Sequence, residues 1–408
     1  MTIQIPLYVQ SVLRQLAAAG HEAYVVGGCV RDSLLGRAPH DWDVCTSALP
    51  SETQRCFAGW RVIETGLRHG TLTVLSDRLP VEVTTYRIDG TYSDNRRPDT
   101  VRFTRSLRED LCRRDFTVGA MAYNPSDGLV DYFGGRADLA ARTLRCVGDP
   151  RARFSEDALR VLRLLRFAAE LDFAAEPATA AAAHACRLLL CNIAAERIAA
   201  ETNRLLAGPA VERVLRAHKD VLTAYLPELD SLPERAWNDT LAALSAAPAD
   251  RAVRWACLLH RLPGADQTAR AVLRRLKFDT ATCERVSLLL RALPAPLPAD
   301  RPAARRLVGA LGSDALRQWL ALHRAAAATD AAKTAAIETA AALLGQVQAD
   351  GDCCTLSTLA VNGRDLAGLA DGPALGALLR RLLDGVLDGR LPNERDALLK
   401  AAADWTAR

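Results

Sequence analysis

The sequence predicts an α+β protein in which strands are confined to the first part of the chain and the rest is helical. Fourteen of the twenty-one aromatic residues lie within the first 170 positions. That region contains runs typical of strands: AYVV (23–26), TLTVL (71–75) and VEVTTYRI (81–88). Beyond about residue 140, Ala, Leu and Arg recur at helical spacing, broken by Pro clusters near 226–233, 247 and 294–302. These breaks predict a series of separate helices.

Bulk properties narrow the class of protein. The 408 residues allow several domains, and a net charge of +4 means that any nucleic-acid surface must come from local clusters of Arg and Lys. The eleven cysteines are odd in number and include no CxxC pair, which favours reduced thiols over disulfides or a zinc site. No stretch approaches the roughly 18 apolar residues of a membrane helix, and the first residues lack a signal-peptide pattern. We expect a cytoplasmic protein without a membrane partner.

The first candidate for chemistry is the segment 23–48. Its strand ends at Gly27 and Gly28, and a helix is expected to begin near Cys29. Glycines at such a junction let backbone N–H groups approach a triphosphate, and Arg31 in the first turn can add a cation. A plain strand-to-helix turn would explain the two glycines as well.

Asp41 and Asp43 follow this helix in a strand-like pattern. Residues i and i+2 of a strand project from the same face, so the two carboxylates converge while Trp42 points away. Paired carboxylates suit Mg²⁺, which prefers oxygen ligands and leaves positions open for phosphate. Glu82, on the expected neighbouring strand, is a candidate third carboxylate. For Asp41 and Asp43 the alternative is a surface turn, and for Glu82 it is an exposed strand residue.

A second candidate lies in the helix expected over 155–173, with Ser155 as N-cap and Asp157 in the first turn. Asp157 and Arg160 would be neighbours on its surface, as would Arg160 and Arg163. A carboxylate accepts from an exocyclic amino group and a guanidinium donates to a ring nitrogen. Cytosine and adenine present that edge, whereas uracil and guanine present a carbonyl. An ordinary ion pair within the helix is the alternative.

Two arginine-rich segments lie between these candidates. The loop within 86–103 contains Arg96 and Arg97 before Pro98, and a second segment places Arg113 and Arg114 before Asp115 at the start of an expected apolar helix. Paired arginines near a metal centre suit a triphosphate or an RNA backbone. For the second segment, a structural ion pair with Asp115 is the competing explanation.

Taken in order, these segments resemble the bacterial class II CCA-adding enzymes, members of the tRNA nucleotidyltransferase and poly(A) polymerase family within the DNA polymerase beta superfamily. The resemblance extends from about residue 5 to 208. Its motifs are GGCVRDSLLG with DWD, the RRP-containing loop, RRDFTVGAMA, DYFGGRADLAARTLRCVG, EDALRVLRLLRF and ERIAAETNRLLAGP.

The resemblance implies a fold of four parts, with a small mixed sheet only in the first. These are a nucleotidyltransferase head (1–140), a helical neck that recognises the nucleotide (141–208), a helical body (209–300) and a helical tail that binds tRNA (301–408). It implies Mg²⁺ held by Asp41 and Asp43 in a two-metal mechanism. The implied nucleotide site comprises Gly28, Arg31, Arg114, Asp157, Arg160, Arg163 and Arg166, and the loop with Asp94, Arg96 and Arg97 is similar to the family's flexible loop.

The implied function is template-independent addition of CCA to the 3′ end of tRNA from CTP and ATP, with the tRNA 3′ end and acceptor arm as partner and no obligatory protein partner. An A-adding specialist, a poly(A) polymerase and a noncatalytic RNA-binding protein are the alternatives. Two departures from the family pattern stand out. Gly119 replaces the usual Asn of the RRDFTxNA motif, and Arg261 replaces the Asp that would follow His260 in an HD-type phosphohydrolase segment, so metal-dependent phosphohydrolysis is not expected.

Overall fold

The computed structural model describes residues 2–90 and 100–406. The predicted loop residues Asp94, Arg96 and Arg97 lie outside the described residues. The chain divides into two compact units, Met1–Asp230 and Ser231–Arg408. This division falls inside the third of the four predicted parts, whose boundaries stay a prediction.

The first unit alternates short helices and strands before becoming helical, as the sequence predicts. Its sheet region contains α1 (Leu7–Ala18), β1 (Ala23–Val26), α2 (Gly28–Leu34), β2 (Asp43–Thr46), α3 (Pro50–Cys56), β3 (Arg61–Gly66), β4 (Thr71–Ser76), β5 (Leu79–Thr85), β6 (Arg87–Asp89), β7 (Val101–Phe103), α4 (Leu107–Cys112), β8 (Met121–Asn124), β9 (Gly128–Asp131), α5 (Gly135–Ala140) and β10 (Thr143–Leu144). Its helical region contains α6 (Pro150–Glu156), α7 (Leu159–Leu171), the short strand β11 (Ala174–Ala175), α8 (Pro177–Cys186), α9 (Ala195–Ala207), α10 (Val211–Ala217) and α11 (Lys219–Thr223).

The main sheet is mixed and has seven strands in the order β3-β4-β5-β2-β1-β8-β9. Only β2 and β5 run parallel, and the other neighbours are antiparallel. This parallel pair sets Asp43 directly beside Glu82. The predicted mixed sheet is therefore confirmed, and its register brings together two carboxylates that lie 39 positions apart in the sequence.

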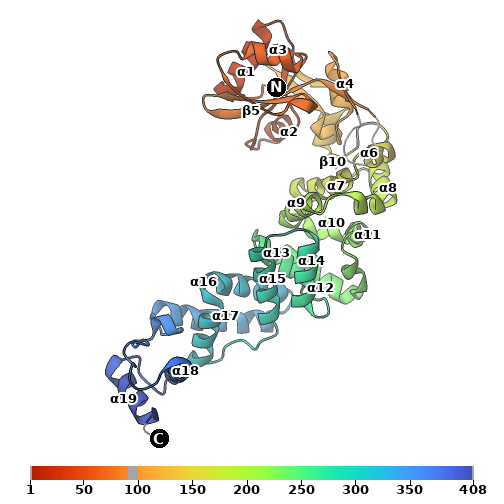
Figure 1. Cartoon of the computed structure of the whole chain (residues 1–408). Helices are drawn as coiled ribbons and strands as arrows, with labels where there is room; N and C mark the ends of the chain where they lie inside the picture. The colour runs from red at the N-terminus through yellow and green to blue at the C-terminus, as the bar shows by residue number, and fades with distance from the viewer. Residues whose placement is uncertain (1, 91–99, 407–408) are drawn as a thin grey trace. The chain divides into compact units, whose positions relative to one another are not determined.

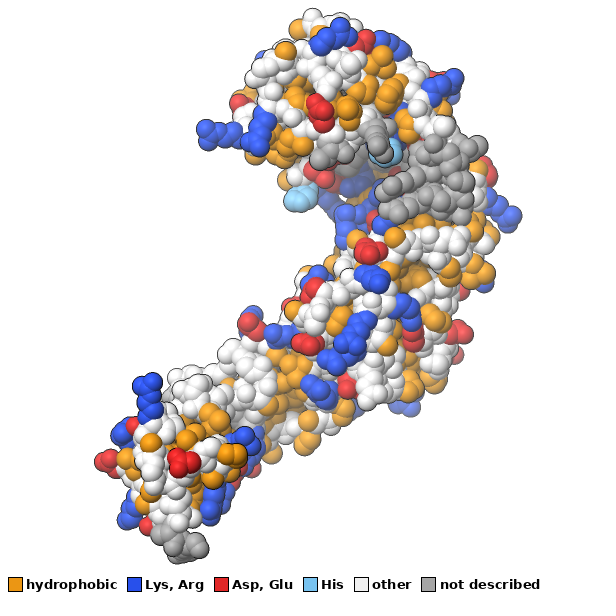
Figure 2. All heavy atoms as spheres, in the orientation of Figure 1, with side chains coloured by type: hydrophobic (Ala, Val, Ile, Leu, Met, Phe, Trp, Pro, Cys, Tyr) orange, Lys and Arg blue, Asp and Glu red, His pale blue; other side chains and the backbone are white. Residues whose placement is uncertain are grey.

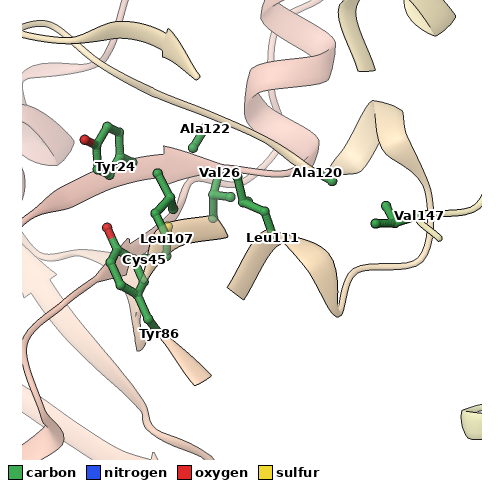
Figure 3. Close-up of a cluster of buried hydrophobic side chains, with 9 residues drawn as sticks. All are labelled: Tyr24, Val26, Cys45, Tyr86, Leu107, Leu111, Ala120, Ala122 and Val147. Carbon is green, nitrogen blue, oxygen red and sulfur yellow. The ribbon is translucent and has the colours of Figure 1, made fainter. Parts of the chain in front are cut away.

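A buried cluster fixes the face of the sheet from which Asp43 projects. Tyr24 and Val26 of β1 and Cys45 of β2 pack with Leu107 and Leu111 of α4 (Figure 3). Because side chains alternate along a strand, Asp43 lies on the same face of β2 as Cys45. In the view of Figure 1, α1 and α3 lie above β5 and α2 lies below it. Helix packing on the sheet therefore holds the start of β2 in place.

The sequence interpretation was wrong about three local elements. The apolar stretch after Asp115 is a 3₁₀ turn, Thr117–Gly119, followed by strand β8, because its apolar residues fill a sheet position between β1 and β9. The run 81–88 is divided between β5 and β6 at the buried Tyr86. The helix expected over 155–173 is two helices, α6 and α7, which separate at Asp157, whose φ of −131° and ψ of 101° are extended. Ser155 therefore lies inside α6, and the N-cap residues of α6 and α7 are Asp149 and Ala158.

Gly208, directly after α9, allows a close approach to α7. A Cβ added at Gly208 would lie 2.6 Å from the carbonyl carbon of Ala169 and 2.7 Å from its Cβ. We expect Gly208→Ala to lower the free energy of unfolding by about 1–3 kcal/mol, because the backbones of α7 and α9 would have to separate. Urea denaturation followed by circular dichroism measures this difference.

Gly345 supplies the matched control for this prediction. It is an exposed residue in a helix of the second unit and has no atom within 4 Å of an added Cβ. Gly345→Ala is expected to stabilise the chain by up to about 1 kcal/mol through helix propensity. Equal stabilities for Gly208→Ala and the unchanged protein would contradict the tight contact.

The second unit is helical throughout its described residues (Figure 1). Its helices are α12 (Glu234–Ala246), α13 (Arg251–Leu259), α14 (Ala265–Arg275), α15 (Thr280–Ala292), α16 (Arg301–Ala326), α17 (Ala331–Ala349), α18 (Gly372–Leu387) and α19 (Arg395–Thr406). Pro233 is the residue before α12 and a proline lies in the first turn of α16, so these proline clusters separate successive helices, as predicted. Among the described residues, no helix is both long and apolar enough to cross a membrane.

Candidate active site

Two adjoining cavities in the first unit contain nearly all the predicted site residues. The first, which we call the carboxylate cavity, has a volume of about 280 Å³. The second, the arginine cavity, has a volume of about 310 Å³. Arg114, Asp115 and Arg163 line both cavities and so form the wall between them. Figure 2 shows Lys and Arg side chains gathered in a hollow of this unit.

Asp41 and Asp43 line the carboxylate cavity as the alternation of the strand predicted. Asp43 opens β2, Asp41 precedes the strand, and Trp42 between them is buried with 7% of its surface exposed. Burial, together with the nearby carboxylates of Asp41 and Glu82, raises the pKa of Asp43 to about 6 against the opposing charge of Arg114. This concentration of negative charge would be relieved by a bound cation.

Glu82 lies beside Asp43 in the sheet, as predicted, but its side chain is exposed and does not line the carboxylate cavity. Among the described residues there is no group of three or more His, Cys, Asp or Glu side chains arranged to hold a metal ion. Two carboxylates with open positions fit an ion whose other ligands come from water and phosphate. The structure therefore fits a metal on Asp41 and Asp43 and leaves Glu82 as a nearby charge.

Arginine side chains also line the carboxylate cavity. Gly27 adopts a φ of 82°, which favours glycine, and an added Cβ there would lie 3.0 Å from Nη1 of Arg114, so that guanidinium would have to shift slightly. Arg31 forms an ion pair of 2.8 Å with Asp32. It also lies over the ring of Phe167, 5.1 Å from the centroid. Gly28 and Arg31 both line this cavity.

Phe167 of α7 organises three arginines at this cavity. Besides Arg31, the guanidinium carbons of Arg163 and Arg166 lie 5.3 and 4.0 Å from its ring centroid, distances typical of cation–π contacts. Arg163 also forms a 2.6 Å ion pair with Asp115, whose pKa is lowered by that arginine despite burial. Asp115 is thus paired with α7 rather than with the arginines that precede it in sequence.

Arg166 is buried, with 3% of its side chain exposed. Its Nε lies 2.9 Å from Oε2 of Glu201 in α9, although the two atoms are not aligned for a hydrogen bond. Burial lowers the pKa of Arg166 to about 10, and Glu201 opposes that shift. Because so little of this side chain is exposed, the arrangement supports a role in bracing α7 against α9.

Asp157 and Arg160 both line the arginine cavity, but not as helix neighbours. Asp157 lies between α6 and α7 and accepts from the backbone N–H of Leu159 at 3.2 Å. Its Oδ2 lies 3.1 Å from Nη2 of Arg197, a residue of α9. The prediction that Asp157 belongs to the first turn of a helix was therefore wrong. The two residues do line one cavity, and their role in binding a nucleotide stays a prediction.

Arg160 is held by three acceptors. Its Nη1 donates to Glu156 at 2.7 Å and to the carbonyl of Arg153 at 3.1 Å, and its Nη2 donates to the carbonyl of Arg113 at 3.0 Å. With 8% of its surface exposed, Arg160 has a fixed position. A fixed guanidinium beside a fixed carboxylate suits recognition of a planar polar ligand.

Sequence reasoning missed several residues of the two cavities. Arg87, Asp89 and Arg197 line the arginine cavity and Arg204 lines the carboxylate cavity. Arg197 lies in the motif ERIAAETNRLLAGP, yet nothing local indicates its partner, since Asp157 is 40 positions away. Only the packing of α7 against α9 brings the two together.

The sequence departs from the family pattern at Gly119 and next to His260, and the structure shows what surrounds these two residues. A Cβ added at Gly119 would lie 3.6 Å from Oδ1 of Asp115, which is an ordinary contact. The Cβ of a larger residue would therefore fit at this position. His260 lies at the end of α13, and its Nδ1 is 2.8 Å from the carbonyl of Cys257. Burial lowers the pKa of His260. The ring of His260 is thus held by the backbone of its own helix.

Three segments of the chain match known protein families. Residues 23–145 match the family described as the Poly A polymerase head domain. Residues 172–232 match a probable RNA and SrmB-binding site of polymerase A, and residues 247–402 match a putative domain 2 of tRNA nucleotidyltransferase. The first match contains both Asp41 and Asp43.

Whole-length relatives agree with these matches. The CCA-adding enzyme of Levilactobacillus brevis is 38% identical over 399 residues, which cover 96% of each chain. That of Geobacillus stearothermophilus is 37% identical over 394 residues, covering 95% of this chain and 94% of the relative. The crystal structure of the Bacillus stearothermophilus CCA-adding enzyme in complex with CTP gives a TM-score of 0.80 at 33% identity, covering 99% of this chain and 98% of that one.

Proposed function

The chain belongs to the CCA-adding enzymes, which are tRNA nucleotidyltransferases, and we propose that it adds C, C and A to the 3′ end of tRNA from CTP and ATP without a nucleic-acid template. The observation that carries this proposal is the pair of adjoining cavities. One contains the converging carboxylates and the other contains Asp157 and Arg160. The same unit can therefore hold the reacting phosphates and the base of one nucleotide side by side.

We assign the triphosphate to the carboxylate cavity. Arg31, Arg114 and Arg163 present guanidinium groups to it, and guanidinium groups match the geometry of phosphate oxygens. Asp41 and Asp43 would hold Mg²⁺ there. Bound metal ions would activate the attacking 3′-hydroxyl and stabilise the charge on the leaving pyrophosphate. Glu82 adds negative charge beside Asp43 and is not assigned as a ligand.

We assign the base to the arginine cavity. Asp157 would accept from the amino group of cytosine or adenine, and Arg160 would donate to the neighbouring ring nitrogen. Uracil and guanine place a carbonyl opposite the carboxylate and leave buried polar groups unpaired, at a cost of about 1–3 kcal/mol for each group. Two such mismatches would exclude the wrong nucleotides without any template.

The experiment that tests this function uses tRNAs that end before CCA, after C or after CC. With Mg²⁺, we expect CTP alone to add two residues to the first tRNA and one to the second, and ATP to complete the third. Added EDTA should stop all three reactions and excess Mg²⁺ should restore them. Extension of the CC-ending tRNA only would identify an A-adding specialist, and repeated A addition without CTP would identify a poly(A) polymerase.

We also propose a cytoplasmic location, supported by the chemistry of the cysteines and by the tRNA substrate. All eleven cysteines are free, and six of them are buried (Cys29, Cys45, Cys146, Cys257, Cys283 and Cys353). Such thiols persist in a reducing compartment.

A further inference from the structure

Asp110 is a fully buried carboxylate that lines neither of the two cavities. It lies in α4 with none of its surface exposed. Its Oδ1 accepts from Nε and Nη2 of Arg113 at 3.0 and 2.8 Å and from the backbone N–H of Arg87 at 3.3 Å. Its Oδ2 accepts from Nη2 of Arg114 at 3.4 Å. One buried side chain thus ties β6 to both arginines that follow α4.

Each partner of Asp110 reaches the site. Arg87 and Arg113 line the arginine cavity, and Arg114 lines both cavities. The carbonyl of Arg113 accepts from Nη2 of Arg160. A continuous set of hydrogen bonds therefore runs from Asp110 through Arg113 to Arg160, the guanidinium assigned to the base.

The charge on Asp110 is stable in this setting. Burial raises its pKa, but the charges of Arg113 and Arg114 outweigh burial, so the pKa lies below its usual value. A buried carboxylate that lost these partners would be costly, and the arginines without the carboxylate would be free to adopt other rotamers. Asp110 is therefore the nearer carboxylate for Arg113, since the other, Asp89, has its Oδ2 3.8 Å from Nη1 of Arg113.

We propose that Asp110 is a positioning residue for base selection. By holding Arg113 and Arg114, it fixes the backbone carbonyl of Arg113, which accepts from Arg160. The position of Arg160 then determines how well C and A are distinguished from U and G. This inference rests on the proposed function. It adds a residue that touches neither nucleotide nor metal, and whose effect is transmitted through two arginines.

The test compares Asp110→Asn with a control of the same chemistry in the second unit. Asp352 also holds two arginines, with Arg301 and Arg305 each within 2.6 Å of one of its oxygens, and its side chain is 9% exposed. Asp352→Asn therefore removes a similar charge in the second unit, which supplies no lining residue to either cavity. For each protein, kcat and KM are measured for CTP and for UTP on tRNA lacking CCA, below the unfolding temperature of the variant.

For Asp110→Asn we expect the ratio of kcat/KM for CTP to that for UTP to fall at least about tenfold, the loss expected when one hydrogen-bonding group is misplaced. The ratio for Asp352→Asn should stay within about twofold of the unchanged protein. Because a general loss of folded protein lowers both rates equally, it cannot change this ratio. An unchanged ratio in Asp110→Asn would overturn the inference.

A second variant keeps the test decisive if Asp110→Asn does not fold. Arg113→Lys retains the positive charge but loses the paired Nε and Nη2 contacts with Asp110, and we expect its ratio to fall in the same direction. An unchanged ratio here would also overturn the inference. If the unchanged protein itself adds no C to tRNA, the proposed function fails instead, so the two failures are distinguishable.

Discussion

Replacing Asp43 by Asn is expected to lower the rate of nucleotide addition by at least about 1,000-fold, because an amide cannot supply the charged oxygen ligand that Mg²⁺ prefers. Single-turnover addition of C to tRNA lacking CCA, at saturating CTP, measures this rate. Asp41→Asn should have an effect of the same order, since both carboxylates line the same cavity. A rate within tenfold of the unchanged protein in both variants would remove these residues from the metal site.

Asp43→Asn should leave the fold intact and, in the absence of metal, raise the free energy of unfolding. The folded-state pKa of Asp43, about 6, lies above the ordinary aspartate value of 3.8, so ionisation of Asp43 opposes folding. This cost is absent below pH 4 and complete above pH 6, where it is on the order of 1–3 kcal/mol. In EDTA at pH 7.5, Asp43→Asn should therefore unfold at a higher temperature than the unchanged protein, and the difference should vanish near pH 4.

Asp127 provides a matched control for the loss of activity. It lies in the turn between β8 and β9 and accepts from the hydroxyl of Tyr24 at 2.5 Å. Asn retains an acceptor oxygen, so Asp127→Asn should add nucleotides at nearly the normal rate. A large loss in this variant would show that the head tolerates no Asp→Asn change and would weaken the conclusion from Asp43.

Asp157→Asn is expected to weaken the choice between CTP and UTP by about 100-fold or more. The carboxylate accepts from the amino group of cytosine, whereas an Asn amide can rotate to donate to the carbonyl of uracil. The variant gains a matched hydrogen-bonded pair with uracil and loses one with cytosine. At about 1–3 kcal/mol for each pair, the two changes together produce an effect of this size. Competition between CTP and UTP for a single addition to tRNA measures the ratio directly.

Asp172→Asn controls for changes in the helix that carries Arg160. Asp172 ends α7 in the left-handed conformation, with a φ of 58°, and lies 3.0 Å from Arg213. Asn tolerates that conformation, and the residue lines neither cavity. Its CTP to UTP ratio should be unchanged. If Asp157→Asn also selects CTP normally, the base must be recognised by other residues.

The sequence by itself determined the local chemistry of this protein. The alternation around Trp42 places Asp41 and Asp43 on one side, and the strand runs at 23–26 and 71–75 correspond to β1 and β4. Proline clusters marked breaks between helices, and α12 and α16 begin at two of them. These features depend on side-chain period and backbone restriction, which act over a few residues. The catalytic and binding roles of the individual residues stay predictions.

The tertiary structure alone decided which distant residues meet. Parallel pairing of β2 with β5 places Glu82 beside Asp43, and the packing of α7 and α9 brings Arg197 to Asp157 and Glu201 to Arg166. In the tertiary structure Asp157 also lies outside the helix that the sequence period predicted for it. Its ion pair with Arg197 of α9 and the break between α6 and α7 outweigh its local helix propensity. Such contacts depend on long-range packing, which has no period in the sequence.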